Sequence, residues 1–337
     1  MVSDTILITG AAGFVGRHLL HLLGQNRATD AKLVAWRRPT SSEEEATPPT
    51  TPDDGRVIWC EIDLLDPAAV SSAIGETRPN QIYHCGGVAN VGDSWSNNYQ
   101  TLRTNVLGTE NLITALRDHD VPARILIPGS ALVYRPSTSA ITEKSPVGPV
   151  SPYGLSKLAQ EMLALAAAKQ DGITVLLTRS FTHVGPGQSS SYAISSFAEQ
   201  IARIEKGRVK PVILVGDLKA RRDLTDVRDT VRAYQLLMNR GTPAFPLNVC
   251  SGNAYRIEEV LEELLTKTSA NVSVRRDPSR ERLTDYPLLL GDPSRINRDV
   301  GWSPEIPLSK TLLDLLEYWR AAIAKRERLS PPGIPPG

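Results

Sequence analysis

A glycine-rich stretch near the start of the chain, TGAAGFVG at Thr9–Gly16, constrains the fold most. It follows a short apolar run at 5–8 and leads into RHLLHLLG, which has helical periodicity. At such a strand-to-helix junction, Gly10 allows a sharp turn and Gly13 lets a pyrophosphate approach the backbone. Gly16 lets the helix pack on the strand. The sequence therefore predicts a dinucleotide-binding turn, with a purely structural turn as the alternative.

The helix start and the next strand indicate which dinucleotide binds. Phe14 and Val15 open the helix, where free N–H groups bind phosphate. KLVAW at 32–36 is a second apolar strand, after which an NAD site carries Asp or Glu for the ribose 2′-hydroxyl. Arg37 and Arg38 stand there instead, and an arginine suits a 2′-phosphate. We predict NADP(H), and NAD(H) remains possible if both arginines are merely solvated.

Asp63 and Leu64 lie at the end of a third predicted strand, RVIWCEID at 56–63. We predict that both residues belong to the cofactor site, with Asp63 at the edge of the adenine. The alternative is that Asp63 caps the following helix, DPAAVSSAI, because Asp is a favoured N-cap residue.

Strands and helices continue to alternate as far as Arg179, which is typical of a sheet covered on both faces. We predict an α/β protein: a Rossmann-type doubly wound parallel sheet with a smaller C-terminal α/β lobe that binds the substrate. The region 256–325 is expected to be rich in helix. The predicted bounds are 1–180 with about 224–250 for the NADP-binding domain, 181–223 with 251–325 for the lobe, and 326–337 for a flexible tail.

A tyrosine and a lysine four residues apart open a predicted helix in PVSPYGLSKLAQE. Ser151 can cap this helix, and Tyr153 and Lys157 then share one face. A nearby ammonium favours the phenolate and lowers a tyrosine pKa from about 10. The predicted strand RILIP ends in Gly129 and Ser130. Ser130 can polarise a carbonyl or cap the strand end. Tyr-x-x-x-Lys also occurs by chance, so the other motifs decide.

The composition excludes several classes of protein. The formal net charge of +1 over 337 residues gives no field for nucleic acid or a membrane surface. No apolar run reaches the roughly 18 residues that span a bilayer, and we recognise no signal peptide. The three cysteines lie far apart, as reduced thiols do, and the five histidines show no metal spacing. We expect a soluble, cytoplasmic protein without a metal.

Four motifs together (TGAAGFVG, Ser130, SPYGLSK and RRDLTDVRD) resemble the extended short-chain dehydrogenase/reductase family of nucleotide-sugar enzymes. The resemblance covers nearly the whole chain. It is strongest to the GDP-mannose branch, and within it to the reductases of GDP-4-keto-6-deoxymannose. It implies a catalytic triad of Ser130, Tyr153 and Lys157, and a GDP-sugar as the substrate.

The resemblance also implies where the substrate binds. Arg222 and Arg282 match positions that usually hold the diphosphate, and Asp285 falls where an acidic side chain commonly meets the ribose. Ser130 would contact the sugar. The family usually reads RPFNH where this chain reads RSFTH, so Thr182 replaces an Asn that often touches the substrate.

A long amphipathic helix is predicted over 96–119, with Asn105 amid apolar neighbours. Asn105 either bonds backbone in the core or orders a water near the site. In many relatives this helix and the helix of the tyrosine motif form a dimer interface, so the resemblance implies a homodimer. Leu155, Met162 and Leu165 fit such an interface or an intrachain core.

The residues after Ser130 bear on the reaction. Dehydratases of the resembled family carry acidic groups where this chain has Ala131 and Leu132. Elimination needs an acid and a base, each contributing about 10²–10⁴ in rate, so dehydration is disfavoured. We favour NADPH-dependent reduction of GDP-4-keto-6-deoxymannose to GDP-rhamnose. The alternatives are a 4-epimerase with bound NAD and, from another class, a non-catalytic NADP-binding protein.

Overall fold

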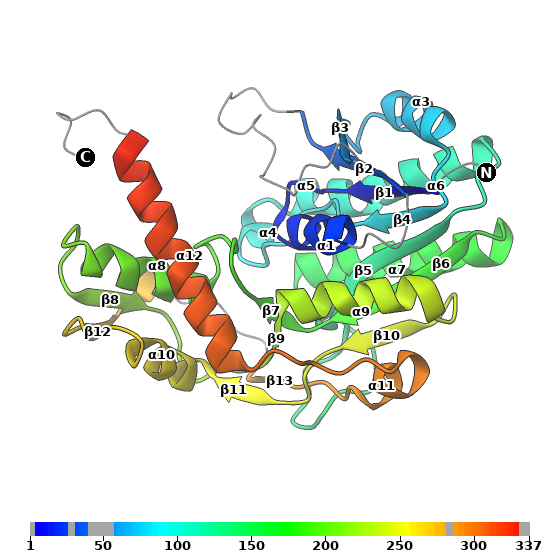
Figure 1. Cartoon of the computed structure of the whole chain (residues 1–337). Helices are drawn as coiled ribbons and strands as arrows, with labels where there is room; N and C mark the ends of the chain where they lie inside the picture. The colour runs from blue at the N-terminus through cyan, green and yellow to red at the C-terminus, as the bar shows by residue number, and fades with distance from the viewer. Residues whose placement is uncertain (1–3, 26–30, 40–56, 281–285, 330–337) are drawn as a thin grey trace.

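The computed structural model describes residues 4–25, 31–39, 57–280 and 286–329 (Figure 1). A large sheet with its helices lies on one side of the molecule and a smaller lobe on the other, and the long helix α12 (Leu308–Leu329) belongs to the lobe (Figure 1). None of the helices in these ranges combines the length and the apolar character needed to cross a bilayer.

The large sheet has seven strands, all parallel, which confirms the predicted Rossmann-type α/β fold. In spatial order the strands are β10 (Pro246–Val249), β6 (Thr174–Ser180), β5 (Arg124–Ser130), β4 (Gln81–His84), β1 (Thr5–Thr9), β2 (Lys32–Arg37) and β3 (Val57–Glu61). The strand order reverses beside β1, between β1 and β4. Ligands of open α/β sheets bind at this reversal, outside the carboxyl ends of the strands.

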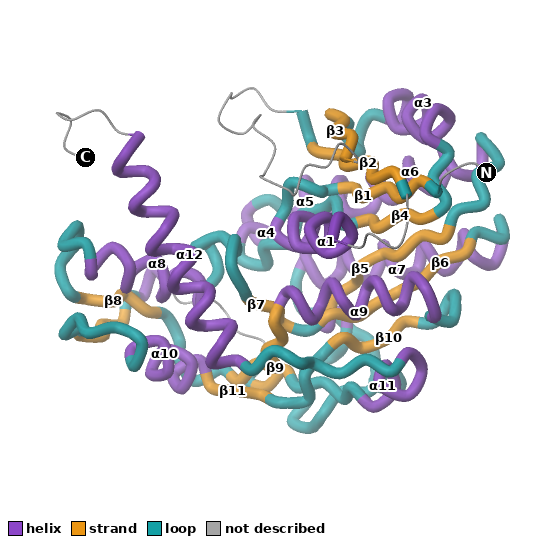
Figure 2. Tube along the Cα trace, viewed as in Figure 1, coloured by secondary structure: helices purple, strands orange, loops and turns teal. Residues whose placement is uncertain are grey.

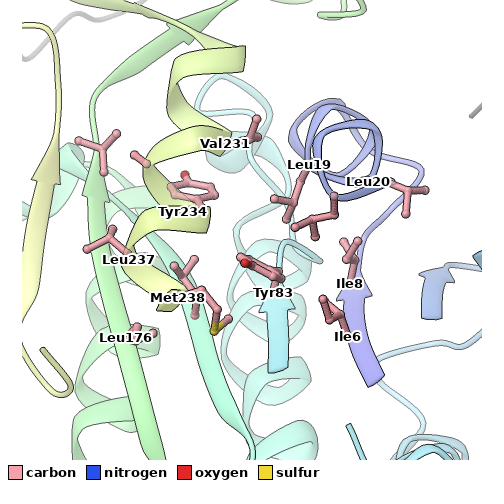
Figure 3. Packing of buried hydrophobic residues seen from close by; sticks show 14 of the residues in the cluster. Ile6, Ile8, Leu19, Leu20, Tyr83, Leu176, Val231, Tyr234, Leu237 and Met238 are labelled. Atoms are coloured by element: carbon pink, nitrogen blue, oxygen red, sulfur yellow. The ribbon is translucent and has the colours of Figure 1, made fainter. Parts of the chain in front are cut away.

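Helices cover both faces of this sheet, as parallel strands require. They are α1 (Phe14–Gln25), α9 (Val227–Arg240) and α11 (Ser294–Val300) on one face, and α3 (Pro67–Thr77), α6 (Gly108–Asp118) and α7 (Pro152–Gln170) on the other. Figure 3 shows Leu19 of α1 and Tyr234 of α9 above Ile8 and Tyr83 of the sheet. This packing fixes the start of α1 at the carboxyl end of β1.

The helix predicted over 96–119 is interrupted. It consists of α5 (Asn98–Leu102), a π-helical turn (Arg103–Leu107) and then α6. Asn105 lies in the π turn and is fully buried, and its amide is bonded to the backbone of Val88. An amphipathic pattern does not reveal one wider turn, so the sequence predicted a continuous helix.

The lobe combines two small sheets with three helices (Figure 2). The first sheet contains β7 (Thr182–Val184), β9 (Arg221–Asp226), β11 (Ala254–Arg256) and β13 (Leu288–Leu289), the second contains β8 (Val212–Val215) and β12 (Ser273–Arg276), and the helices are α8 (Ala193–Glu205), α10 (Ile257–Leu265) and α12. One apolar cluster joins the three helices.

Two parts of the C-terminal region differ from the prediction. The helix-rich stretch 256–325 also contains β12 and β13, which are too short for periodicity to predict. Helix α12 continues to Leu329, so 326–329 is helical and not part of an irregular tail. The rest of the predicted tail, 330–337, lies outside the described residues.

Candidate active site

The glycine-rich turn joins β1 to α1 in tight contact with the end of β4. Gly10 has a φ of +64°, and a Cβ added there would lie 2.7 Å from the carbonyl oxygen of Cys85. A Cβ on Gly16 would collide with the carbonyl oxygen of Gly10. Gly13, in contrast, is exposed and faces open space except for the same oxygen at 3.1 Å. The turn is therefore closed against the protein and open toward a ligand.

The start of α1 has the properties of a phosphate site. The N–H groups of Phe14 and Val15 have no hydrogen-bond partner in the described part of the chain. A helix N-terminus carries positive potential and binds anions through such groups. The ring of His183, from β7 of the lobe, stacks on Phe14 with the centroids 6.0 Å apart. The lobe thus reaches the turn that would hold a dinucleotide.

The two arginines after β2 differ in their surroundings. Nη2 of Arg37 lies 2.8 Å from Oε1 of Glu61 at the end of β3. Arg38 is exposed and forms no ion pair with a described residue. Arg37 is thus partly neutralised, and Arg38 offers its charge to a ligand.

Asp63 and Leu64 lie between β3 and α3. Oδ1 of Asp63 accepts from the N–H of Leu65 at 2.9 Å, whereas the N-cap of α3 is Asp66. The alternative that Asp63 caps this helix is therefore wrong. Leu64 packs beside Gly86, because a Cβ added to Gly86 would lie 2.5 Å from Cδ1 of Leu64. Leu64 therefore borders the carboxyl end of β4, and Asp63 precedes it in the loop after β3.

Ser130 and Tyr153 meet at the carboxyl end of β5. Ser130 is the last residue of that strand, and its hydroxyl accepts from the N–H of Leu132 at 3.2 Å. Helix α7 begins at Pro152, with the hydroxyl of Ser151 as its cap, and this places Tyr153 in the first turn. The two side chains lie close enough for Ser130 to lower the pKa of the Tyr153 phenol, and only 7% of Ser130 and 8% of Tyr153 is exposed.

The pKa of Tyr153 differs from the prediction. Burial raises the pKa, the nearby Ser130 hydroxyl lowers it, and Tyr192 raises it further. The lowering expected from Lys157, one turn along α7, is not found, because burial dominates. Burial also lowers the pKa of Lys157 to about 8, with the Cys85 thiol acting in the opposite direction. Tyr153 is therefore protonated at neutral pH and can act as a proton donor.

Asn105 takes the first of its two predicted roles. Its Oδ1 accepts from the N–H of Val88 at 2.8 Å, and its Nδ2 donates to the carbonyl of Val88 at 3.0 Å. Nδ2 also lies 2.9 Å from the hydroxyl of Ser156 on α7. Asn105 therefore ties the loop after β4 to α7, the helix that carries Tyr153 and Lys157.

A cavity of about 480 Å³ opens in the lobe. Thr182 and Arg222, both predicted to bind the substrate, line it. Tyr192 also lines it and lies close enough to Tyr153 to raise the pKa of that phenol. Through Tyr192, the cavity therefore reaches the neighbourhood of Tyr153.

Sequence reasoning did not assign some of the residues that line this cavity. Arg280 lines it at the end of a 3₁₀ turn (Pro278–Arg280), and Asp93 reaches it from α4 (Asp93–Ser96). The cluster of arginines over 275–282 pointed to this region, but spacing could not choose among them. Arg282 and Asp285 lie outside the described residues.

Comparison with known proteins gives the family. A family profile described as GDP-mannose 4,6 dehydratase matches residues 7–315. The chain belongs to this family. The predicted membership of the extended short-chain dehydrogenase/reductase enzymes is thereby confirmed. Among the described residues, no group of three or more His, Cys, Asp or Glu side chains is placed to hold a metal ion.

Relatives with different reactions match the chain over nearly its full length. GDP-6-deoxy-D-mannose reductase of Pseudomonas aeruginosa is 31% identical over 96% of this chain and 99% of its own. UDP-glucose 4-epimerase of Bacillus subtilis is 28% identical over 94% of this chain and 96% of its own. A structure of RMD from Pseudomonas aeruginosa with NADPH is 30% identical, with a TM-score of 0.81, and covers 95% of this chain and 100% of its own.

Proposed function

We propose that this protein uses NADPH to reduce the C4 ketone of GDP-4-keto-6-deoxy-D-mannose and forms GDP-D-rhamnose. The observation that carries the proposal is the 31% identity, over nearly the whole of both chains, to GDP-6-deoxy-D-mannose reductase. The proximity of Ser130 to Tyr153, with Lys157 on the next turn of the helix that carries Tyr153, supports it.

The cofactor residues fit a dinucleotide phosphate. NADPH supplies the hydride when it is bound. The proposed cofactor residues lie at or just after the carboxyl ends of β1, β2 and β3. They are Gly10, Gly13, Phe14, Val15, Gly16, Arg37, Arg38, Asp63 and Leu64. The exposed guanidinium of Arg38 favours a 2′-phosphate over a hydroxyl. Lys157 would hold the ribose on the nicotinamide side.

The chain's own residues account for the proton. The hydroxyls of Ser130 and Tyr153 would both donate to the ketone oxygen, which polarises the carbonyl. Because burial raises the pKa of Tyr153, the phenol keeps its proton until charge develops on that oxygen. After the transfer, the ammonium of Lys157 would stabilise the phenolate.

The substrate would occupy the lobe cavity. We assign the diphosphate to Arg222 and Arg282, the ribose to Asp285 and the sugar to Thr182 and Ser130. The cavity position of Thr182 and Arg222 supports this assignment, and Arg280 adds a second positive charge to the lining of the same cavity.

Dehydration remains disfavoured. Ala131 and Leu132 form the turn after Ser130, and neither side chain can give or take a proton. Epimerisation is the second candidate, because a UDP-glucose 4-epimerase is 28% identical to this chain. An epimerase would keep NAD bound through purification and would need no added NADPH.

The test is NADPH oxidation with GDP-4-keto-6-deoxy-D-mannose, with the C4 configuration of the product determined by NMR. We expect oxidation by the wild type and none above background by Tyr153→Phe. Equal rates for the two proteins would reject the reductase proposal. Interconversion of C4 epimers without added NADPH, together with bound NAD, would establish the epimerase instead.

We further propose a cytoplasmic homodimer. Large apolar side chains are exposed along α4, α5 and α7, including Tyr99 at 72%, Met162 at 63% and Leu155 at 50%, whereas Leu165 packs on the core. Met162→Glu should give a monomer by light scattering, and Leu313→Glu, at an exposed position on α12, should not. A wild type that runs as a monomer at assay concentration would contradict the dimer. Free cysteines at all three positions fit a reducing compartment.

A further inference from the structure

A chain of buried polar side chains runs beneath Lys157. Nζ of Lys157 donates to Oε1 of Gln160 at 2.6 Å, and Nε2 of Gln160 donates to Oγ1 of Thr109 at 2.7 Å. Oγ1 of Thr109 lies 2.9 Å from Nε2 of His84, and Nδ1 of His84 lies 2.9 Å from Oγ1 of Thr9. All four residues behind the lysine are at most 2% exposed. The chain thus links the catalytic helix to β4 and β1.

The proton positions in this chain follow from the donors and acceptors. The hydroxyl of Thr109 gives its single proton to the carbonyl of Asn105 at 2.8 Å. It must therefore accept from both Gln160 and His84, so Nε2 of His84 carries the proton. Nδ1 of His84 is then an acceptor, and Thr9 donates to it. Each group in the chain is thus assigned as a donor or an acceptor. His84 donates through Nε2 and accepts through Nδ1, so it is neutral.

The far end of the chain touches the predicted cofactor turn. Oγ1 of Thr9 accepts from the N–H of Gly86 at 3.0 Å. Gly10 follows Thr9, and its Cα position is packed against Gly86. The same hydrogen bonds therefore connect the backbone of the glycine-rich turn with the ammonium of Lys157.

We propose that Gln160 is a positioning residue that holds the Lys157 ammonium toward the cofactor, with its amide orientation set by neutral His84 through Thr109. Because Thr109 takes up the NH₂ side of the amide, the carbonyl side must face the lysine. The inference rests on the proposed function, in which the ammonium binds the nicotinamide-side ribose. It assigns Gln160 no contact with substrate or cofactor.

The charges around Lys157 make this acceptor important. His84 and Cys85 at the end of β4 interact electrostatically with the lysine, but burial lowers the pKa of His84 to about 3 and raises that of Cys85 to about 12. Both are neutral at physiological pH, and so is Tyr153 on the same helix. The π-helical turn contributes the Asn105 amide and α6 the Thr109 hydroxyl to this network, and neither group titrates in this range.

The carboxylate of Glu161, the next residue along α7, is held by Arg179 from β6 at 2.9 Å. No described carboxylate pairs with Lys157. The Gln160 carbonyl is therefore the acceptor that favours the charged lysine, since a hydrogen bond to the charged form stabilises it. With burial lowering the pKa of Lys157 to about 8, losing this acceptor would leave much of the lysine neutral near physiological pH.

The experiment measures NADPH affinity against pH by fluorescence titration, between about pH 6 and pH 10, without any nucleotide sugar. The proteins are the wild type, Gln160→Leu, Gln160→Glu and Thr109→Val. Gln170→Leu and Gln170→Glu, at the exposed end of the same helix, are the matched controls. Circular dichroism and melting temperature establish that each is folded.

We expect the wild type to lose affinity as Lys157 deprotonates. Gln160→Leu should move this loss about one pH unit lower, a tenfold change in the ratio of charged to neutral lysine. Gln160→Glu should move it to higher pH, because a carboxylate favours the ammonium and the Thr109 hydroxyl can turn to donate to it. Thr109→Val should give a smaller downward shift, and both Gln170 variants should follow the wild type.

Folded Gln160 variants whose profiles coincide with the wild type would overturn the proposal and leave Gln160 a packing residue. A wild-type profile that is flat over this range would also overturn it. If Gln160→Leu does not fold, the upward shift of Gln160→Glu decides. The titration is repeated with NADH. If the protein prefers NADH to NADPH, NADH binds more tightly, but the pH profiles of the wild type and the variants keep the same order.

Discussion

The two sides of the active site are built in different ways. On the cofactor side, Gly10 directly follows β1, Ser130 is the last residue of β5, and Tyr153 lies in the first turn of α7, which packs on the sheet. On the lobe side, Thr182, Arg222 and the other lining residues come from short segments far apart in the chain. The regular sheet fixes where the reaction takes place, and irregular packing shapes the cavity beside it.

This difference indicates how one fold accommodates several reactions. A reductase and an epimerase each match more than nine-tenths of this chain. In this chain the parallel sheet positions the groups proposed to move a proton, whereas cavity residues on short strands and turns can change without disturbing that sheet. Chemistry and specificity should therefore respond differently to substitution.

Tyr153→Phe tests the cofactor side and should have the largest effect. Loss of the phenolic proton should lower kcat by about 10²–10⁴, the usual contribution of a general acid. NADPH and substrate affinities should change little, because the ring remains. Steady-state kinetics and fluorescence titration measure the two quantities. A rise in KM at unchanged kcat would place Tyr153 among the binding residues.

Asp223→Ala tests how the lobe is held together. This buried carboxylate accepts from the N–H groups of Ser251, Gly252 and Gly291 at 2.7–3.1 Å. Leaving buried donors unpaired should lower the free energy of unfolding by about 3 kcal/mol, measured by urea denaturation. Asp118→Ala, at a side chain 58% exposed, should change it by less than about 0.5 kcal/mol. Similar losses in the free energy of unfolding for both variants would mean that the Asp223 carboxylate does not hold these three backbone segments together.

Local sequence predicted the strands, the glycine-rich turn and the helix starts of the cofactor side. Gly10 and Gly16 contact each other and are only six positions apart, so the local sequence is enough to predict the turn. Ser151 and Pro152 likewise start α7 where the sequence predicted it. The long-range partners escaped prediction. Arg37 meets Glu61, Asn105 meets Val88 and Gln160 meets Thr109 because of how strands and helices pack.

The lobe cavity was harder to predict for the same reason. Arg280 and Asp93 face one space although almost two hundred positions separate them. A two-residue strand such as β13 has no periodicity to read. The resemblance supplied Arg222 and Thr182, whereas composition and spacing did not.

Arg280→Gln sharpens the comparison on the lobe side. If this guanidinium meets the diphosphate, its loss should raise KM for the nucleotide sugar by about tenfold or more with kcat little changed, since ground-state and transition-state binding fall together. Arg275→Gln, on β12 outside the cavity lining, is the matched control. Equal KM values for both variants would remove Arg280 from the substrate site.

Arg38→Ala addresses the cofactor preference. The exposed guanidinium should bind the 2′-phosphate of NADPH, so its removal should weaken NADPH binding by about tenfold and NADH binding by less than twofold. The ratio of the two dissociation constants is the readout. A larger effect on this ratio from Arg37→Ala would mean that Arg37 leaves Glu61 to bind the phosphate.

Lys157→Met should produce the smallest effect, on the stability of the cofactor-free protein. Burial lowers the pKa of Lys157 from 10.5 to about 8, so between these values the unfolded chain binds more protons than the folded one. Stability therefore rises with pH there, by about 1 kcal/mol between about pH 8 and pH 9. Below the folded pKa the buried ammonium is fully destabilising.

The variant should remove this dependence. The difference in free energy of unfolding between Lys157→Met and the wild type, measured by urea denaturation at each pH, should favour the variant at neutral pH and shrink as the pH rises. Groups that titrate elsewhere contribute equally to both proteins and cancel. A difference independent of pH would mean that Lys157 keeps an ordinary pKa without cofactor. A variant more stable but inactive would show that the cofactor side keeps a destabilising charge for its chemistry.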